Sequence, residues 1–263
     1  MLRDLTYAKV SFGLILGLAV SHIVFATWPT LDLWVAGLFY RDSRFPLADL
    51  MWLEVLRNSF WNLAIGLALG CLIMWVVTLL MGFRAHTPAQ VWFFGWFSFV
   101  LGPGILVNGI FKSHWGRARP AHLEQFGGDK LFTPPFEMAD QCVRNCSFVS
   151  GEGAASVMFA LVVGILLWNS VPRRYLPVFI TILTVIAVVF ALLRVVKGRH
   201  FLSDILIGGW MMALIALGLF WAFRLHAHLP SFTSRNIRSD FRYLRAHVWR
   251  PVAKRIAKVF YDV

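Results

Sequence analysis

The sequence predicts an all-α integral membrane protein with six transmembrane helices and with amphipathic segments in its first outer loop and its basic C-terminal tail. Hydrophobic residues make up 59% of its 263 residues, and its mean hydropathy is +0.68. Charged residues are only 14% of the total and fall between long apolar runs, whereas soluble domains carry about a quarter. Six of these runs approach the ~20 residues that a helix needs to cross a bilayer. They are residues 8–27, 61–83, 91–111, 153–168, 176–195 and 205–223.

The first run, residues 8–27, is expected to be a retained helix. A secretory signal peptide ends in small residues at a cleavage site, whereas this run ends in Thr-Trp-Pro. The fourth run is the shortest, and its helix is expected to extend toward Ser150. No linker separates two apolar blocks, so we expect one six-helix membrane domain, residues 1–225, and then a basic tail, residues 226–263.

Basic residues in the short connections predict the orientation. They lie before the first run, between the second and third, and between the fourth and fifth. They are Arg3, Lys9, Arg84, Arg173 and Arg174. The tail after Phe223 adds nine Lys/Arg against two Asp. All these segments fall on one face, so the positive-inside rule predicts a multi-pass protein of the plasma (inner) membrane with both termini cytoplasmic. Loops 28–60, 112–148 and 196–204 then face outward, to the periplasmic side.

The tail has the pattern of an amphipathic helix. Apolar residues recur at helical spacing with Arg and Lys between them, which is typical of a helix that lies on anionic lipid. We set nucleic-acid binding aside, because basic cytoplasmic ends are common in membrane proteins. The apolar positions are Phe241, Leu244, Val248, Val252, Ile256, Val259 and Phe260.

Three cysteines occur. Cys71 lies inside the second run and is expected to be a small buried apolar residue. Cys142 and Cys146 lie in the second outer loop, where an oxidising exterior permits a disulfide. Two free thiols are the alternative. A disulfide would rigidify the approach to residues 147–152. Two cysteines without neighbouring ligands make a poor zinc site.

The segment from Lys112 to Pro120 directly follows the third run and contains Arg117 and Arg119. Snorkelling of long cationic side chains at a membrane end would explain one or two of these charges. It explains three cations within eight residues poorly, since positive charge prefers the cytoplasmic side. A mobile Lys and a planar Arg fork are instead suited to phosphate oxygens.

Two further polar segments share this face. Ser150 and Gly151 lead into the fourth run, and a helix N-terminus favours an anion, although such residues also cap many helices. His200 and Asp204 are four residues apart, so they share one helix face. A carboxylate that accepts from one imidazole nitrogen fixes the tautomer and raises the basicity of the other. A lone His at a helix start is often only a satisfied polar residue, but Arg194 and the other segments converge here.

The three segments resemble the signature of the type 2 phosphatidic acid phosphatase family, which is related to vanadium haloperoxidases. The family pattern is Lys-x6-Arg-Pro, then Pro-Ser-Gly-His, then Ser-Arg-x5-His-x3-Asp. The first motif matches in full, and the third matches except that Leu193 replaces Ser. In the middle motif Val149 replaces Pro and Glu152 replaces His. The matching residues of the first and third motifs are Lys112, Arg119, Pro120, Arg194, His200 and Asp204.

The resemblance covers at least residues 91–225 and implies a six-helix core with an outward-facing site and no cofactor. It implies a covalent phosphohistidine on His200, which Asp204 would orient. It also implies a set of ligands for the phosphoryl oxygens. These are Lys112, Arg119, Arg194, Ser150 and the amide of Gly151.

Glu152 stands where the family has the acid that protonates the leaving group. A neighbouring phosphate and partial burial would favour its protonated form, so we expect Glu152 to act as that acid. The alternatives are a leaving group that needs little help, His114 as a second acid, or an inactive enzyme.

The resulting expectation is a phosphatase that hydrolyses phosphate from a membrane lipid. The candidate substrates are lipid A or a related glycolipid, an isoprenoid diphosphate and phosphatidylglycerol phosphate. We favour lipid A, because a long outer loop and a changed acid suit a large sugar headgroup. A lipid-to-lipid phosphotransferase and a non-catalytic phospholipid-binding or transport protein are the alternatives. The oligomeric state is left open.

Overall fold

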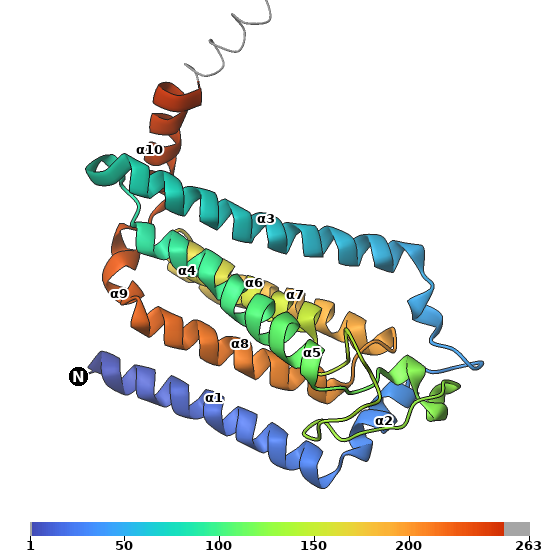
Figure 1. Cartoon of the computed structure of the whole chain (residues 1–263). Helices are drawn as coiled ribbons and strands as arrows, with labels where there is room; N and C mark the ends of the chain where they lie inside the picture. The colour runs from blue at the N-terminus through green and yellow to red at the C-terminus, as the bar shows by residue number, and fades with distance from the viewer. Residues whose placement is uncertain (1, 250–263) are drawn as a thin grey trace, which may run out of the picture.

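The computed structural model describes residues 2–249, which fold into helices without a β-strand in that part of the chain (Figure 1). Five stretches are long and apolar enough to cross a membrane, and one shorter apolar helix, α6, joins them. The helices are α1 (Leu2–Thr27), α2 (Thr30–Gly37), α3 (Met51–Met81), α4 (Ala89–Phe99), η3 (Val100–Phe111), α5 (Lys112–His114), α6 (Gly151–Leu167), α7 (Leu176–Val196), α8 (Leu202–Ala222), α9 (Leu225–His228) and α10 (Ser234–Leu244). Short helical turns are η1 (Pro46–Ala48), η2 (Gly82–Arg84), η4 (Pro120–His122), η5 (Glu124–Phe126), η6 (Arg173–Tyr175), η7 (Leu229–Ser231) and η8 (Arg245–Trp249). The prediction of an all-α membrane fold is confirmed.

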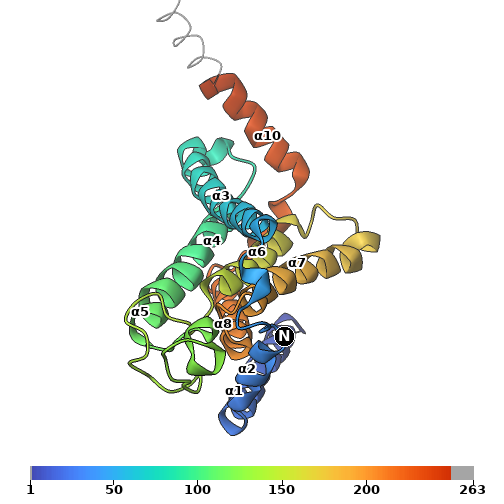
Figure 2. The ribbon, with the colours of Figure 1, turned by 90° about the vertical axis from the view of Figure 1, so that its right-hand side faces the viewer.

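The short helix α6 occupies the middle of the bundle. It packs against α3, α4, η3, α7 and α8, and Figure 2 shows it between these helices. Small residues at its start, Gly153 to Ser156, are buried and let the neighbouring helices approach closely. As expected, it begins next to Ser150, whose side chain accepts a hydrogen bond from the Gly153 amide.

Glycines also allow close contacts between the outer helices. A Cβ added at Gly95 on α4 would lie 2.6 Å from the sulfur of Cys71, which is buried as predicted. A Cβ added at Gly17 on α1 would lie 2.8 Å from the Trp210 ring on α8. These glycines therefore allow close approach, as small residues do between membrane helices.

The third span continues without a break from α4 through η3 into α5. Its middle part is a π-helix that contains Pro103. Proline lacks an amide hydrogen and clashes with the preceding turn, so the helix widens there. This span ends at His114 with the single turn of α5, which begins with Lys112.

The second span differs from its prediction. The apolar run was expected to begin at residue 61, but α3 begins at Met51. Glu54, Arg57 and Asn58 interrupt the hydrophobic pattern of its first turns, so the apolar run alone did not indicate that the helix begins at Met51. The outer loop before it contains the helix α2, in which Asp32 is buried and Trp34 is exposed.

The bundle has two distinct ends. The connections that carry the three motifs lie at the end where α2, α5 and the start of α8 meet, whereas the N-terminus, α9 and α10 lie at the other (Figure 1). The predicted grouping of the motif segments at one end is therefore seen in the fold.

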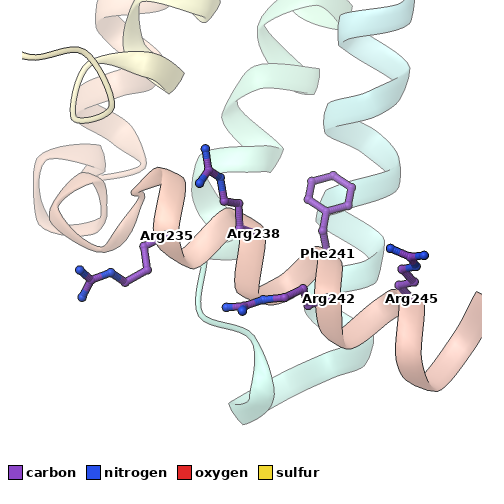
Figure 3. A pocket seen from close by; sticks show the side chains of 5 residues that line it. All are labelled: Arg235, Arg238, Phe241, Arg242 and Arg245. Carbon is purple, nitrogen blue, oxygen red and sulfur yellow. The ribbon is translucent and has the colours of Figure 1, made fainter.

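Helix α10 runs across the bundle helices rather than along them (Figure 1). The fully buried carboxylate of Asp240 fixes it to the connection between α3 and α4. One of its oxygens accepts from the amide of His86 at 2.8 Å, and the other accepts from the Thr87 hydroxyl at 2.6 Å. Figure 3 shows Arg238, Phe241 and Arg245 projecting to the same side of α10. The remaining apolar positions predicted for the tail, from Val252 onward, lie outside the described residues.

Candidate active site

A polar cavity of about 470 Å³ opens at the motif end of the bundle. Lys112, Arg119, Glu152 and Arg194 line it together, so each of the three segments contributes a side chain, whereas His200 and Asp204 are buried and do not line it. Six cationic and three acidic side chains line the cavity, which gives it three net positive charges. The cationic ones are Arg57, Lys112, Arg119, Arg194, Lys197 and Arg199, and the acidic ones are Asp49, Glu54 and Glu152. Such a cavity favours a dianion such as a phosphate monoester.

Asn145 joins the two cations of the first motif. Its side-chain oxygen accepts from Lys112 Nζ at 3.3 Å, and its backbone carbonyl accepts from Arg119 Nη2 at 2.8 Å. Asn145 lies within the ring that the Cys142–Cys146 disulfide closes. The disulfide therefore constrains a residue that contacts both cations.

Gly151 brings the N-terminus of α6 against the cations. A Cβ added at Gly151 would lie 3.1 Å from Lys112 Nζ and 2.9 Å from the Asn108 side-chain oxygen. A side chain at this position would require Lys112 and Asn108 to shift, so glycine allows their close approach to the helix end. Ser150 and Gly151 are not among the residues that line the cavity; they form the helix end behind it.

His200 is buried, with 1% of its surface exposed. Its Nδ1 lies 2.7 Å from the carbonyl oxygen of Ser147. A carbonyl can only accept, so Nδ1 carries the hydrogen and Nε2 keeps its lone pair for a nucleophilic role. Burial lowers the pKa of His200 to about 4, and the positive charges of Lys112 and Arg194 act in the same direction. The ring is therefore neutral at physiological pH.

Asp204 does not accept the hydrogen bond that its spacing from His200 suggested. Its Oδ2 lies 3.7 Å from Nδ1, because its carboxylate oxygens already have other donors. Oδ2 accepts from the Ser147 hydroxyl at 2.5 Å and from the Phe201 amide at 2.9 Å. Asp204 thus acts on His200 through Ser147, which it holds with its carbonyl toward the ring.

Arg117 belongs to the hydrogen-bond network around Asp204, a role that its place in the sequence did not indicate. It is fully buried and donates to Asp204 at 2.6 Å, to Asp32 at 2.8 Å and to the Ser203 hydroxyl at 2.9 Å. Its guanidinium also lies over the Phe201 ring, 4.1 Å from the centroid. Arg117 therefore ties α2 and the start of α8 to the motif loop, while Arg119, two residues later, lines the cavity.

Glu152 lies between two arginines. Its Oε1 accepts from Arg57 Nη1 at 2.9 Å, and its Oε2 lies 3.3 Å from Arg194 Nη1. Arg57 was also missed, because it lies on the part of α3 that was predicted to be loop. Glu54 in turn accepts from Arg57 Nε and from Lys197 Nζ, at 2.9 and 2.7 Å.

Arg194 keeps an unused donor. Only 8% of its surface is exposed, yet its Nε has no hydrogen-bond partner among the described residues. A buried donor without a partner is costly. An oxyanion in the cavity would satisfy it.

A second, apolar groove of about 300 Å³ lies farther along the same helices. Its lining on α3, η3 and α6 lies one helical turn deeper than cavity residues on the same helices. The pairs are Arg57 and Trp61, Lys112 and Asn108, and Glu152 and Ala155. Polar and apolar surfaces in this order match a lipid with an anionic headgroup. No group of three His, Cys, Asp or Glu side chains suited to a metal occurs within residues 2–249.

Comparison with known proteins agrees with this geometry. The model of the PAP2 superfamily matches residues 91–227. The chain is 34% identical over 217 residues to a lipid A 4'-phosphatase of Francisella tularensis subsp. novicida, covering 75% of this chain and 90% of that relative. It is 30% identical over 212 residues to lipid A 4'-phosphatases of Rhizobium leguminosarum and Rhizobium etli, covering 73% of this chain and 86% and 78% of those proteins. No solved structure matches significantly.

The superfamily match spans more than half of the chain and includes every motif residue that the sequence indicated. The similarity to the relatives extends over about three quarters of the chain. The chain therefore belongs to the PAP2 superfamily and is a phosphatase that acts on lipids.

Proposed function

We propose that the protein removes the 4'-phosphate of lipid A, or the corresponding phosphate of a related glycolipid, and releases it as orthophosphate. The observation that carries this proposal is the similarity to lipid A 4'-phosphatases, which extends over 90% of the Francisella protein. The cationic cavity and the adjoining groove support it, because they suit a phosphorylated headgroup and an acyl chain.

His200 is the proposed nucleophile. Its Nε2 bonds to phosphorus, and the bond between phosphorus and the sugar oxygen breaks. The ring then carries a positive charge, which the Ser147 carbonyl and the nearby Asp204 carboxylate stabilise. Water attacks phosphorus in the second step, the phosphorus–nitrogen bond breaks, and neutral His200 and orthophosphate result.

Positive charge assists both steps. Lys112, Arg119 and Arg194 are the proposed ligands of the phosphoryl oxygens, with the N-terminus of α6 behind them. The departing sugar oxygen takes up one proton. Glu152, which lines the cavity, is its proposed donor.

We place the protein in the inner membrane with its cavity on the periplasmic side. The support is the positive-inside rule: the basic N-terminal segment and the arginines of α10 lie at the end opposite the cavity (Figure 1). The arginines and Phe241 of α10 form a basic, partly apolar surface (Figure 3). We propose that anionic lipid headgroups bind this surface.

The test uses purified protein in detergent with lipid A that carries phosphates at both ends of its disaccharide. We expect one equivalent of orthophosphate and a product that mass spectrometry identifies as lacking the 4'-phosphate. His200→Gln is expected to release none. With phosphorus-32 on the substrate, the parent should yield labelled histidine after rapid quenching. Removal of the other phosphate, or no release while isoprenoid diphosphate is hydrolysed, would refute the substrate assignment.

A further inference from the structure

Arg57 lines the phosphate cavity, but it belongs to none of the three motif segments. It lies on α3, outside residues 91–227 that match the superfamily model. The early start of α3 brings it to the motif end of the bundle. It contributes to the cavity a guanidinium that the motifs do not account for.

Arg57 and Arg194 share one anionic partner. Each donates to a different oxygen of the Glu152 carboxylate, at 2.9 and 3.3 Å. Two guanidinium groups from separate helices therefore point to one position that an anion occupies. A guanidinium fork can bind a phosphoryl group in the same bidentate manner as a carboxylate, and the phosphoryl group offers more oxygens and charge.

We propose that Arg57 is a further ligand of the substrate phosphate and that this phosphate replaces Glu152 between Arg57 and Arg194. The inference rests on the proposed function for the identity of the substrate, but the exchange itself requires only an oxyanion. The unpartnered Nε of Arg194 supports it, because a phosphoryl group can satisfy that donor in addition to Nη1.

Glu54 lets Arg57 exchange partners without moving. Glu54 holds Nε of Arg57, and its other carboxylate oxygen binds Lys197 at 2.7 Å. These contacts leave Nη1 of Arg57 directed to Glu152. The side chains of Arg57 and Glu152 are 22% and 23% exposed. Partial burial strengthens each charge interaction compared with bulk water.

The exchange would also change the surroundings of Glu152. Once phosphate binds between the arginines, the Glu152 carboxylate no longer contacts Arg57 and Arg194, and it lies beside the bound substrate.

The experiment measures the binding of orthophosphate to the full-length protein in detergent by isothermal titration calorimetry. The variants are Arg57→Ala, Arg57→Lys and Glu152→Gln. Arg41→Ala is the matched control, because Arg41 is exposed in the loop that precedes α3 and does not line the cavity. Thermal unfolding of each variant establishes that it is folded.

Loss of one charge-assisted hydrogen bond should weaken orthophosphate binding by about tenfold or more in Arg57→Ala. Arg57→Lys, which keeps the charge but loses the planar fork, should be intermediate. Glu152→Gln removes the competing carboxylate, so it should bind orthophosphate more tightly than the parent. Arg41→Ala should match the parent.

Folded Arg57→Ala with the parent's affinity would overturn the proposal, and so would Glu152→Gln without tighter binding. These measurements need no turnover. If the lipid assignment is wrong, lipid A hydrolysis is absent in all variants, while the order of orthophosphate affinities remains.

Discussion

At the scale of the residue, the protonation state of His200 determines whether this proposed nucleophile is available. Burial lowers its pKa to about 4, so Nε2 keeps its lone pair at neutral pH. As pH falls through about 4, Nε2 takes up a proton and nucleophilic attack stops. The ring is therefore expected to remain neutral at pH 5, where an ordinary His, of pKa about 6.5, is charged.

Nuclear magnetic resonance of protein with nitrogen-15 in its histidines measures this titration directly. The signals of His200 are those that disappear in His200→Gln. A midpoint near pH 4 agrees with the buried ring. A midpoint near pH 6.5 would contradict it.

Two neighbouring arginines are expected to respond very differently to the same substitution. Arg117→Met leaves Asp32 and Asp204 buried without their cation, and breaking such a pair costs roughly 3–5 kcal/mol of folding free energy. Arg119→Met removes a half-buried cavity cation and should weaken substrate binding in a folded protein. Thermal unfolding should show the loss of stability in Arg117→Met, and a higher KM for lipid A should show the weaker binding in Arg119→Met. Equal thermal stability of the two variants would disprove the structural role of Arg117.

Motif spacing predicted the convergence of Lys112, Arg119 and Arg194, because each lies a fixed distance from a span end. The distinct roles of Arg117 and Arg119 could not be predicted in this way. Both are arginines in one loop, and only the buried carboxylates from α2 and α8 distinguish them. The hydrogen-bond acceptor of His200 is likewise a backbone carbonyl, that of Ser147. The types of the side chains in a sequence do not tell where a backbone carbonyl lies.

At the scale of the element, hydropathy located the membrane helices but not all their limits. Hydropathy placed the start of the second span at residue 61, because the charged residues Glu54 and Arg57 lower the hydropathy of the first turns of α3. In the fold, Glu54 and Arg57 are partnered by Lys197 and Glu152 from other helices. Tertiary ion pairs thus extend α3 beyond its hydrophobic run, and they create the part of the site that the sequence did not reveal.

Helix α10 is expected to bind anionic lipid through its arginines, each of which contributes about 1 kcal/mol near such a surface. In nanodiscs, chymotrypsin should cleave at Phe241 and Tyr243 more slowly with phosphatidylglycerol than with phosphatidylcholine. The triple substitution Arg238→Glu, Arg242→Glu and Arg245→Glu should abolish this difference.

The matched control for α10 is Arg173→Glu with Arg174→Glu, which reverses charges in the connection between α6 and α7 and leaves α10 unchanged. It should retain protection by phosphatidylglycerol. Equal cleavage of the parent in both lipids would show that α10 does not rest on anionic lipid.

At the scale of the whole molecule, the polar cavity and the apolar groove are arranged in the order of a lipid's headgroup and chain. Arg57 lines the cavity and Trp61, one turn deeper on α3, lines the groove. Because the groove lies between α3 and η3 and follows the cavity along both helices, we expect it to hold the acyl chain of a lipid whose phosphate occupies the cavity.

Filling the groove should therefore impair turnover of the lipid but not of a soluble phosphate ester. Ala68 lines the groove, so the larger side chain of Ala68→Phe would occupy the space of an acyl chain. A loss of about 1.4 kcal/mol of lipid binding would raise KM for lipid A by about tenfold. Leu63→Phe on the same helix is the control, because Leu63 is 57% exposed and lies outside the groove. Glucosamine 4-phosphate, which has no acyl chain, should be hydrolysed by both variants at the parent's rate. An equal loss of activity with both substrates would mean that Ala68→Phe disturbs the phosphate site itself, and that the acyl chain of the lipid does not use this groove.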